Sequence, residues 1–481
     1  MRKEFFINII FLIVINLLIK PFYLFGIDLQ VQNTVAEGTY GLYFALFNFT
    51  FLFQIINDFG IQNYNNRNIS QHNHLLDKYF PNILILKLLL AAVYLLLVFL
   101  TAILAGYSFV YFELLLFIGI NHILLSLILF LRSNISGLAL YRTDSLISVL
   151  DRLLLIIICG VLLSVEPYRS NFRIEWFVYA QTTTLLLTAT AAFLIVYKRL
   201  KRFKLRFDLA FLLVILRRSY PYALAVFLMT IYTRIDGVMI ERMLVNGKLE
   251  ADYYASAYRL LDACNMIGFL FAGLLLPMFS RMIKERESVA DLVRFSFQFI
   301  WAGAIPLTIA TFFFQEEIMT LLYKNGGAYS GAILGFLITS FLAVSGSYIY
   351  GTLLAANDSL KQMNIIYIIS VFLNVSLNLW LISTHKALGA AMATCLTQFL
   401  VFFAQILLAK KELKLGVRID MILRMLFFFA LQLMLTYAMM SFLAAPWLVK
   451  FLASISCGLL FSFIFRLIDL RQLQLLFSKT K

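Results

Sequence analysis

Tyr197-Lys-Arg-Leu-Lys-Arg-Phe-Lys-Leu-Arg206, with Arg217-Arg218 shortly after it, is the densest basic run of the chain. It lies near the middle of the 481 residues, with long apolar stretches before and after it. Charges this close together repel one another and cannot enter a hydrocarbon core together. The run therefore lies on a membrane surface, and the cytoplasmic side is favoured because basic loops accumulate there. It serves either as a solvated linker or as a contact for anionic headgroups, worth about 1 kcal/mol per charge.

The composition indicates a polytopic membrane protein. Of the residues, 62% are hydrophobic and 14% charged, and the mean hydropathy is +0.89. Soluble domains carry about 25% charged residues, so a soluble fold of this length could not cover so much apolar surface. The net charge of +15 would favour nucleic acid as the partner of a soluble protein. Here cytoplasmic loop charge explains it, and since no nucleic-acid motif accompanies it, we expect no such partner.

Fourteen stretches are long enough to cross a bilayer, which takes about 20 apolar residues. Arg2 and Lys3 precede the first stretch, and no small-residue cleavage site follows it, so we expect a membrane helix and not a removable signal. The predicted spans are 5–27, 39–62, 79–105, 109–131, 144–165, 174–197, 219–241, 254–279, 289–314, 330–355, 362–383, 387–409, 421–443 and 446–467.

The loop charges predict the orientation of these spans. With the N-terminus inside, the inner loops and tails hold 27 of the 40 basic residues, and the outer loops hold 7. Basic residues favour the cytoplasmic side, so both termini are predicted to be cytoplasmic, in agreement with the even number of spans.

The central basic run divides the spans into six and eight, and the two halves begin alike. Asp28 and Glu37 precede Tyr40-Gly-Leu-Tyr43 in the first half, and Glu250 and Asp252 precede a tyrosine pair in the second. Two related bundles that rock about a shared cavity are a common transporter plan. The predicted domains are a six-helix bundle at 1–197, a basic cytoplasmic linker at 198–218, a second six-helix bundle at 219–409, and two further helices with a tail at 410–481.

Charges inside the spans need an explanation, because one at the bilayer centre costs about 2.5–3.5 kcal/mol. Lys20 in the first span and Arg234 in the seventh lie at similar depth, and neither has an opposite charge one turn away on its own face. They are candidates for an anion site that lines a water-filled cavity. Lys87 and Arg294 lie near inner helix ends, so we expect their side chains to extend to the interface.

Other charged residues are candidates for ion pairing. Arg259 and Asp262 are three residues apart and share a helix face, and Arg259 is also a candidate cation of the cavity. Asp58 ends the second span and is interpreted as a polar helix end at the inner rim. The acidic candidates for coupling or ion pairing are Asp236, Asp262 and Asp151, the last of which precedes Arg152 and so points in a different direction.

No signature of an enzyme is present. The chain has no Gly-x-x-x-x-Gly-Lys-Ser/Thr loop for phosphate binding, so it is not expected to hydrolyse ATP. The histidines and cysteines do not form a metal or catalytic set, and we expect no cofactor and no catalytic residue. These residues are His72, His74, His122, His385, Cys159, Cys264, Cys395 and Cys457.

Several stretches resemble the polysaccharide flippases of the multidrug/oligosaccharidyl-lipid/polysaccharide exporter superfamily, the Wzx-type O-antigen transporters. The resemblance covers most of the chain. The first span departs from the family pattern, since Pro21-Phe-Tyr-Leu24 leads to Ile27-Asp28 and the basic residue of this region is Lys20. The stretches that carry the resemblance are Asn57-Asp-Phe-Gly-Ile-Gln-Asn-Tyr-Asn-Asn-Arg-Asn-Ile69, Arg234-Ile-Asp-Gly-Val-Met-Ile240, Tyr253-Tyr-Ala-Ser-Ala-Tyr-Arg-Leu-Leu261, Leu276-Pro-Met-Phe-Ser-Arg281, Gly351-Thr-Leu-Leu-Ala-Ala-Asn357, Asn374-Val-Ser-Leu-Asn378 and Leu388-Gly-Ala-Ala-Met-Ala-Thr394.

The resemblance implies an all-α, MATE-like fold of two related six-helix bundles around a central cavity, plus two C-terminal helices. It implies an inner-membrane flippase for an undecaprenyl-diphosphate-linked oligosaccharide, an O-antigen or capsule repeat unit, working by alternating access. The expected partners are this lipid-linked oligosaccharide, membrane lipids, and a glycan polymerase with other assembly proteins. Lys20, Arg234 and Arg259 would offset the diphosphate charge, which interacts strongly in low dielectric.

Two alternatives remain open. A cation-coupled exporter of amphipathic drugs shares the fold, although it would favour acidic over basic residues in its cavity. A membrane scaffold for glycan assembly, which transports nothing, would tolerate loss of the charges within the spans.

Overall fold

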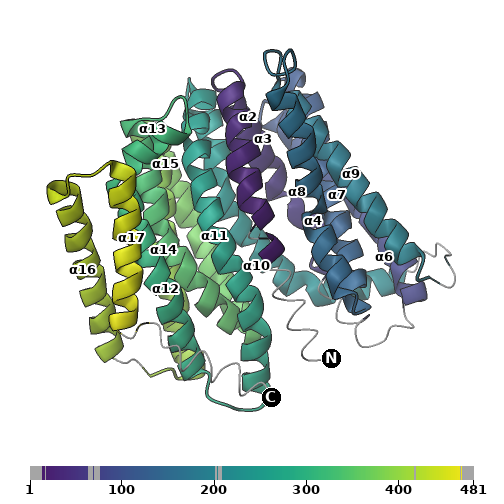
Figure 1. Ribbon diagram of the computed structural model, residues 1–481. Helices are drawn as coiled ribbons and strands as arrows, with labels where there is room; N and C mark the ends of the chain where they lie inside the picture. Colours follow the sequence, from purple (N-terminus) through teal and green to yellow (C-terminus); the bar gives the residue numbers. More distant parts are fainter. Residues whose placement is uncertain are drawn as a thin grey trace. The chain divides into compact units, whose positions relative to one another are not determined.

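The computed structural model describes residues 14–16, 18–62, 65, 69, 76–200, 203, 209–416, 419–465 and 467. These residues form helices, labelled in Figure 1, and contain no β-strand. His72, His74 and most of the central basic run lie outside the described residues. The helices are η1 (Leu24–Asp28), α2 (Leu29–Thr34), α3 (Thr39–Leu52), α4 (Gln54–Asp58), α6 (Leu76–Leu104), η3 (Phe109–Tyr111), α7 (Phe112–Gly137), α8 (Tyr141–Ser164), α9 (Ile174–Tyr197), α10 (Leu209–Met243), α11 (Gly247–Lys284), α12 (Ala290–Phe313), α13 (Gln315–Leu322), α14 (Ala328–Ala356), α15 (Leu360–Leu413), α16 (Ile419–Phe442) and α17 (Trp447–Ile464).

Twelve helices within the described residues are long and apolar enough to cross a membrane, the first of them Val14–Thr34. This confirms the all-helical, multi-pass fold that the composition predicts. The difference from the fourteen predicted spans arises at two places, α15 and the pair α3 and α4.

α15 holds two of the predicted spans. Lys386 interrupts the helix with φ 56° and ψ −135°. Asn374 Nδ2 donates to Thr397 Oγ1 (3.4 Å), and Gln405 Nε2 donates to Tyr367 Oη (3.2 Å). Each bond joins residues nearly equidistant from Lys386, so the chain reverses there, and α15 is an antiparallel hairpin of two spans.

The second predicted span, 39–62, is a helix broken into α3 and α4. Phe53 leaves the helix at φ −91° and ψ −1°, and its N–H bonds to the Thr50 carbonyl. Thr50 Oγ1 donates back to the Leu46 and Phe47 carbonyls (3.0 and 2.9 Å), a type of bond that bends helices. Neither piece alone is long enough to cross a bilayer, so the span is a bent one.

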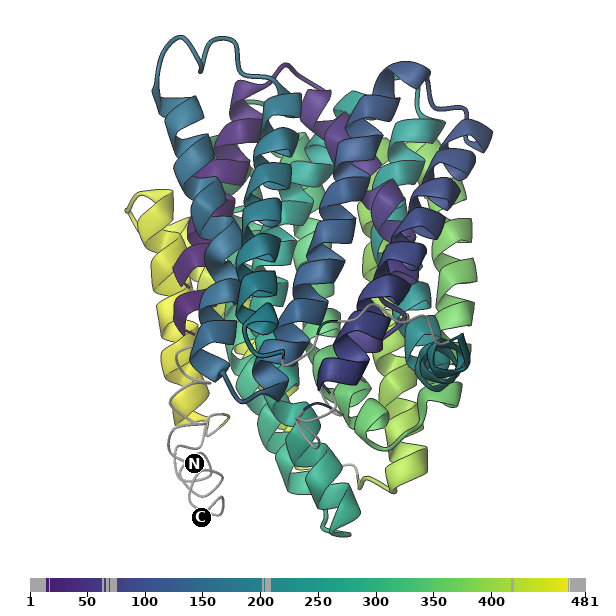
Figure 2. The same cartoon turned by 90° about the vertical axis from the view of Figure 1, so that its right-hand side faces the viewer.

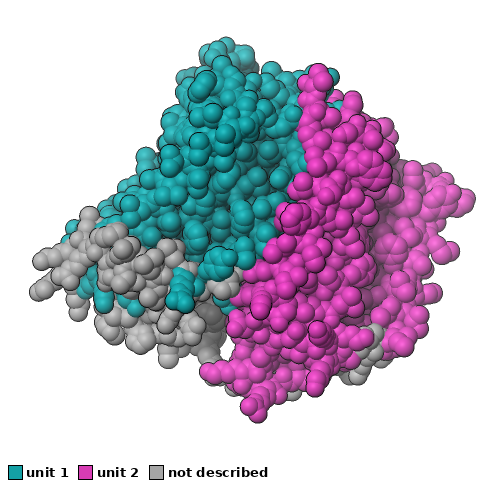
Figure 3. All heavy atoms as spheres, turned by 180° about the vertical axis from the view of Figure 1, so that it is seen from behind, with its two compact units in different colours: residues 1–242, 246–252 teal, residues 243–245, 253–481 magenta. Residues whose placement is uncertain are grey.

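The chain divides into two compact units, which Figure 3 shows in different colours: residues 1–242 with 246–252, and residues 243–245 with 253–481. In unit 1, α7, α8 and α9 pack against one another, as Figure 2 shows. In unit 2, α14 packs against α15 and α12, and α12 also contacts α16 and α17. Nearly all of α10 belongs to unit 1. The predicted division into six-helix bundles at 1–197 and 219–409, with the basic linker between them, stays a prediction.

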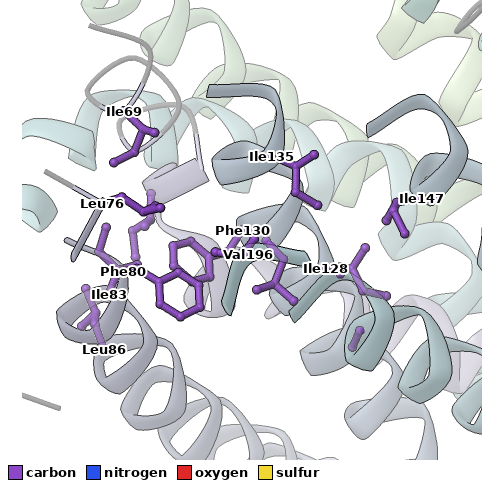
Figure 4. Close-up of a cluster of buried hydrophobic side chains, with 14 of the residues drawn as sticks. Ile69, Leu76, Phe80, Ile83, Leu86, Ile128, Phe130, Ile135, Ile147 and Val196 are labelled. Atoms are coloured by element: carbon purple, nitrogen blue, oxygen red, sulfur yellow. The ribbon is translucent and has the colours of Figure 1, made fainter. Parts of the chain in front are cut away.

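A buried hydrophobic cluster (Figure 4) joins α6, α7, α8 and α9 of unit 1, and Leu200 and Phe203 of the basic run pack against it. Phe80 of α6 stacks on Phe130 of α7 at 5.5 Å between ring centroids, and it lies 6.0 Å from Phe193 of α9. Phe203, within the basic run, contacts Phe80 and Phe193 at 6.3 and 6.5 Å. Leu200 and Phe203 therefore anchor the described part of the run to the helices that precede it.

Candidate functional site

The first span turns an acidic side chain into the interior of unit 1. Pro21 cannot donate a helical hydrogen bond, and three residues later the π-helix η1 begins, a distortion often found at functional sites. Asp28, at the end of η1, is 3% exposed. Tyr40 Oη donates to Asp28 Oδ2 (2.7 Å), and Tyr23 Oη lies 3.4 Å from Oδ1. The first span and α3 are thus joined through one carboxylate.

Arg152 of another helix interacts with this carboxylate, and it also acts on Lys20 of the first span. Arg152, near the middle of α8, stacks on the Tyr23 ring at 4.7 Å from the centroid. Its Nε lies 3.6 Å from Asp151 Oδ2, because the long arginine side chain can bend back to its neighbour. The charged groups that act on Lys20 are Arg152, Arg132 and Asp151, which are two cations and one carboxylate.

The positive charge of Arg132 is neutralised by Asp144. Its Nε and Nη2 donate to both oxygens of Asp144, at 2.7 and 3.2 Å. Among the described residues, Asp151 is the carboxylate that acts on Lys20, and it is also within ion-pair distance of Arg152, on which Asp28 acts as well. Lys20 and Arg152 form what we call the cation pair, a place where an anion would be stabilised in low dielectric.

Arg234 lies on α10, within unit 1. Its guanidinium stacks on the Phe51 ring of α3 at 5.6 Å. Asp236, two residues on, is 1% exposed. A methyl group on Gly237 would meet Phe44 and Asn48 at 2.8 Å, so α10 approaches α3 closely here. Lys20 and Arg234 therefore both belong to unit 1, on different helices.

Lys87 does not extend to the membrane interface, so that prediction is wrong. It is 6% exposed, and its Nζ donates to Asp58 Oδ1, the Asn57 carbonyl and Ser126 Oγ at 2.7, 2.8 and 2.8 Å. All three ammonium protons have an acceptor. Asp58 is thus the partner of a buried cation, at the point where Phe59 takes a left-handed conformation and α4 ends.

Arg259 and Asp262 form the expected pair on α11 of unit 2. Arg259 Nη1 lies 3.8 Å from Asp262 Oδ2, and their side chains are 15% and 21% exposed. A role of Arg259 in substrate binding stays a prediction.

The sequence interpretation missed Arg152, Asp28 and Tyr23. The sequence interpretation has Arg152 and Asp151 pointing in different directions, which their ion pair contradicts, and nothing in α8 alone shows that the first span packs beside Arg152. The available signal was a proline, a glycine and an acid within eight residues of one span, which indicates a distorted helix with a polar interior. Within the described residues, no group of three or more metal-ligating side chains is found.

Two families match the chain over more than half of its length. The family described as "Polysaccharide biosynthesis protein" matches residues 6–283. The family described as "Lipid II flippase MurJ" matches residues 152–458.

Two curated relatives match a shorter segment. The proteins named "Lipid III flippase" from Escherichia coli (strain K12) and Shigella flexneri are each 25% identical over 134 residues, which is 28% of this chain. The matched segment spans about a third of the length of each relative, 32%.

Solved structures share the fold at low identity. One titled "Lipid II flippase MurJ, inward closed conformation" has a TM-score of 0.73 and 16% identity, over 97% of this chain and 99% of that one. An inward-facing MATE family transporter has a TM-score of 0.60 and 15% identity, over 81% and 94%. A structure whose title names a MOP superfamily transporter from Pyrococcus furiosus has a TM-score of 0.59 and 14% identity. The match covers 85% of this chain and 94% of that chain. The chain therefore belongs to the family described as "Polysaccharide biosynthesis protein", whose model matches more than half of it.

Proposed function

We propose that this chain is a flippase, and not an enzyme, for an undecaprenyl-diphosphate-linked oligosaccharide, an O-antigen or capsule repeat unit. It moves the sugar and diphosphate from the inner to the outer leaflet of the cytoplasmic membrane by alternating access, while the lipid tail stays in the bilayer. Both termini lie in the cytoplasm, and a glycan polymerase and other assembly proteins are its neighbours. The names of the relatives, which refer to flippases of lipid-linked molecules, support this substrate class.

The observation that carries the proposal is the cation pair. Lys20 and Arg152 come from two spans of one unit, and Asp151 is the carboxylate that they share. A charge at the bilayer centre costs about 2.5–3.5 kcal/mol, so two cations in spans of one unit are a large cost for a structural role alone, even with carboxylates beside them. A diphosphate has the charge to match both, and Arg234 supplies a third cation of the same unit. A site of this sign suits a lipid diphosphate better than a cationic drug.

Replacing each cation with alanine tests the proposal. Lys20→Ala, Arg152→Ala and Arg234→Ala should each reduce glycan export in intact cells, measured as surface glycan per copy of the protein. Losing one charged donor costs about 1–3 kcal/mol, or roughly a 5- to 150-fold loss of transport. Lys20→Arg should retain part of the activity, because the charge is kept.

The matched control is Lys450→Ala, which removes a basic residue from α17, outside unit 1. Lys450 Nζ donates to the Met440 carbonyl at the protein surface, so transport should stay at the parental level. Normal export by all three abundant alanine variants in unit 1 would rule out the anion site and favour the scaffold alternative.

A further inference from the structure

His122, which the proposed function does not use, lies in an aromatic slot near the middle of α7 in unit 1. Its ring centroid is 4.8 Å from that of Phe47 and 5.4 Å from that of Phe51, both on α3. The guanidinium of Arg234 stacks on the same Phe51 ring at 5.6 Å. Phe51 therefore contacts both the imidazole and the cation, and Arg234 acts electrostatically on His122.

One ring nitrogen of His122 has no hydrogen-bond partner in the described structure. The side chain bonds to the backbone of Phe47, while Nε2 is buried and unpartnered. The bond to Phe47 is therefore made through Nδ1, and the residue as a whole is 2% exposed. A buried polar atom without a partner costs about 1–3 kcal/mol, and such an atom in a native fold calls for an explanation.

The charges around His122 are positive or neutralised. On α10 the neighbour is Arg234. On α6 it is Lys87, which reaches Ser126, one turn along α7 from His122, and which is paired with Asp58 of α4. On α9 the neighbours of the adjacent Asn121 are Gln181 and Thr182, both uncharged. On α3 they are the two phenylalanines.

We propose that His122 takes up one proton when a diphosphate binds at Arg234, and that the protonated Nε2 then donates a hydrogen bond to that diphosphate. This inference rests on the proposed function. A positive charge on the ring is opposed first by its burial and then by like-charge repulsion from Arg234. An anion on Arg234 cancels the repulsion, offsets the cost of burial by pairing with the charge, and supplies the acceptor that Nε2–H needs. Nδ1–H keeps its bond to Phe47, so the ring need not turn.

The consequence is a transport step that carries a proton with the anion. Histidine suits this role, because its charge changes close to physiological pH. Binding that consumes a proton weakens as pH rises, by up to about tenfold per pH unit for one linked proton.

Calorimetry on the purified full chain tests the proposal. Binding is measured at one pH in two buffers of different ionisation enthalpy, which gives the protons taken up per ligand bound. The probes are UDP-glucose, a soluble sugar diphosphate diester, and a polyprenyl-diphosphate-linked sugar. Neither diester titrates between about pH 6 and pH 8, so any uptake belongs to the protein. Binding of both probes would assign the site to the headgroup, and binding of the lipid alone would show that the tail is also needed.

The test variant is His122→Asn, which keeps a donor near the position of Nδ1 and lacks Nε2. The control variant is His385→Asn, which makes the same substitution at a histidine outside the proposed site. His385 is exposed in the α15 reversal, where its Nδ1 lies 2.8 Å from Thr384 Oγ1. The parent and His385→Asn should take up close to one proton, and His122→Asn close to none, with an affinity that no longer depends on pH.

Two outcomes overturn the inference while the proposed function stands. One is parental protein that binds a probe with no proton uptake between about pH 6 and pH 8, a result that needs no variant. The other is His122→Asn with the uptake of the parent. A parent that binds neither probe would overturn the proposed function and this inference together.

Discussion

At the scale of single residues, Lys87 shows how a charge can be accommodated inside a membrane protein. Its three donors meet a carboxylate, a carbonyl and a hydroxyl, from α4 and α7. The position of Lys87 near a helix end suggests from sequence that it extends to the interface. The three acceptors become available only because α4 ends at Asp58, and that break is decided by tertiary packing around Phe59, which no periodicity shows.

The buried pair should matter greatly for stability. Lys87→Met leaves the carboxylate of Asp58 without its cation, and breaking a buried pair on one side costs about 3–5 kcal/mol. Lys87→Met should therefore lower the midpoint of thermal unfolding clearly in detergent, and adding Asp58→Leu should restore most of the loss.

The control for this experiment is Arg424→Met. Arg424 forms an ion pair with Asp420, but both side chains are about half exposed, 48% and 55%, and such pairs contribute about 0–1 kcal/mol. Equal losses for Lys87→Met and Arg424→Met would contradict the view that Lys87 is held in a dry interior.

Single residues also show why the sequence predicts only part of the candidate site. Lys20 and Arg234 stand out because each is a cation in an apolar span. Arg152 does not, since an acid stands next to it. Its contact with Tyr23 joins two helices about 130 residues apart in the chain, and one sequence contains no record of that proximity.

At the scale of elements, glycines mark where backbones touch. A Cβ on Gly389 would collide with the carbonyl of Leu381, on the other side of the reversal in α15. A Cβ on Gly351 would meet only the end of the Gln405 side chain, at 3.3 Å. The small-residue pattern in the sequence predicts both positions, but it does not rank them.

Gly389→Leu should therefore lower the yield of folded protein before it alters substrate preference. Backbone cannot move aside as a flexible side chain can, and overpacking costs about 1–3 kcal/mol or more. Fluorescence-detected size-exclusion chromatography measures the folded yield. Gly160→Leu, at a site on α8 with open space around its Cβ, should express normally. Full yield of Gly389→Leu with changed substrate preference would instead indicate a position exposed to substrate.

At the scale of the whole molecule, hydropathy predicts the helices well because each span must be apolar by itself. It also separates the two spans of α15 correctly, at 362–383 and 387–409, but it shows neither the bend at Phe53 nor the sharp reversal at Lys386. Those features depend on hydrogen bonds between segments and on a few backbone angles.

The orientation is tested by labelling cysteines in cells. In a variant without the four native cysteines, Val245→Cys should react with an impermeant thiol reagent added outside, because Val245 is fully exposed between two spans. Lys204→Cys, in the basic run, should react only after the cells are opened. Labelling of Lys204→Cys in sealed cells would reverse the orientation.

The reversal in α15 also bears on how the protein is made. Asn374 and Asn378 are fully buried in the first half of α15, and Asn374 bonds to Thr397 of the second half. A first half released alone into lipid would present both amides to hydrocarbon, where unsatisfied polar groups are costly. The bond between the two amides satisfies only part of their capacity, so we expect the two spans of α15 to enter the bilayer together and not one after the other.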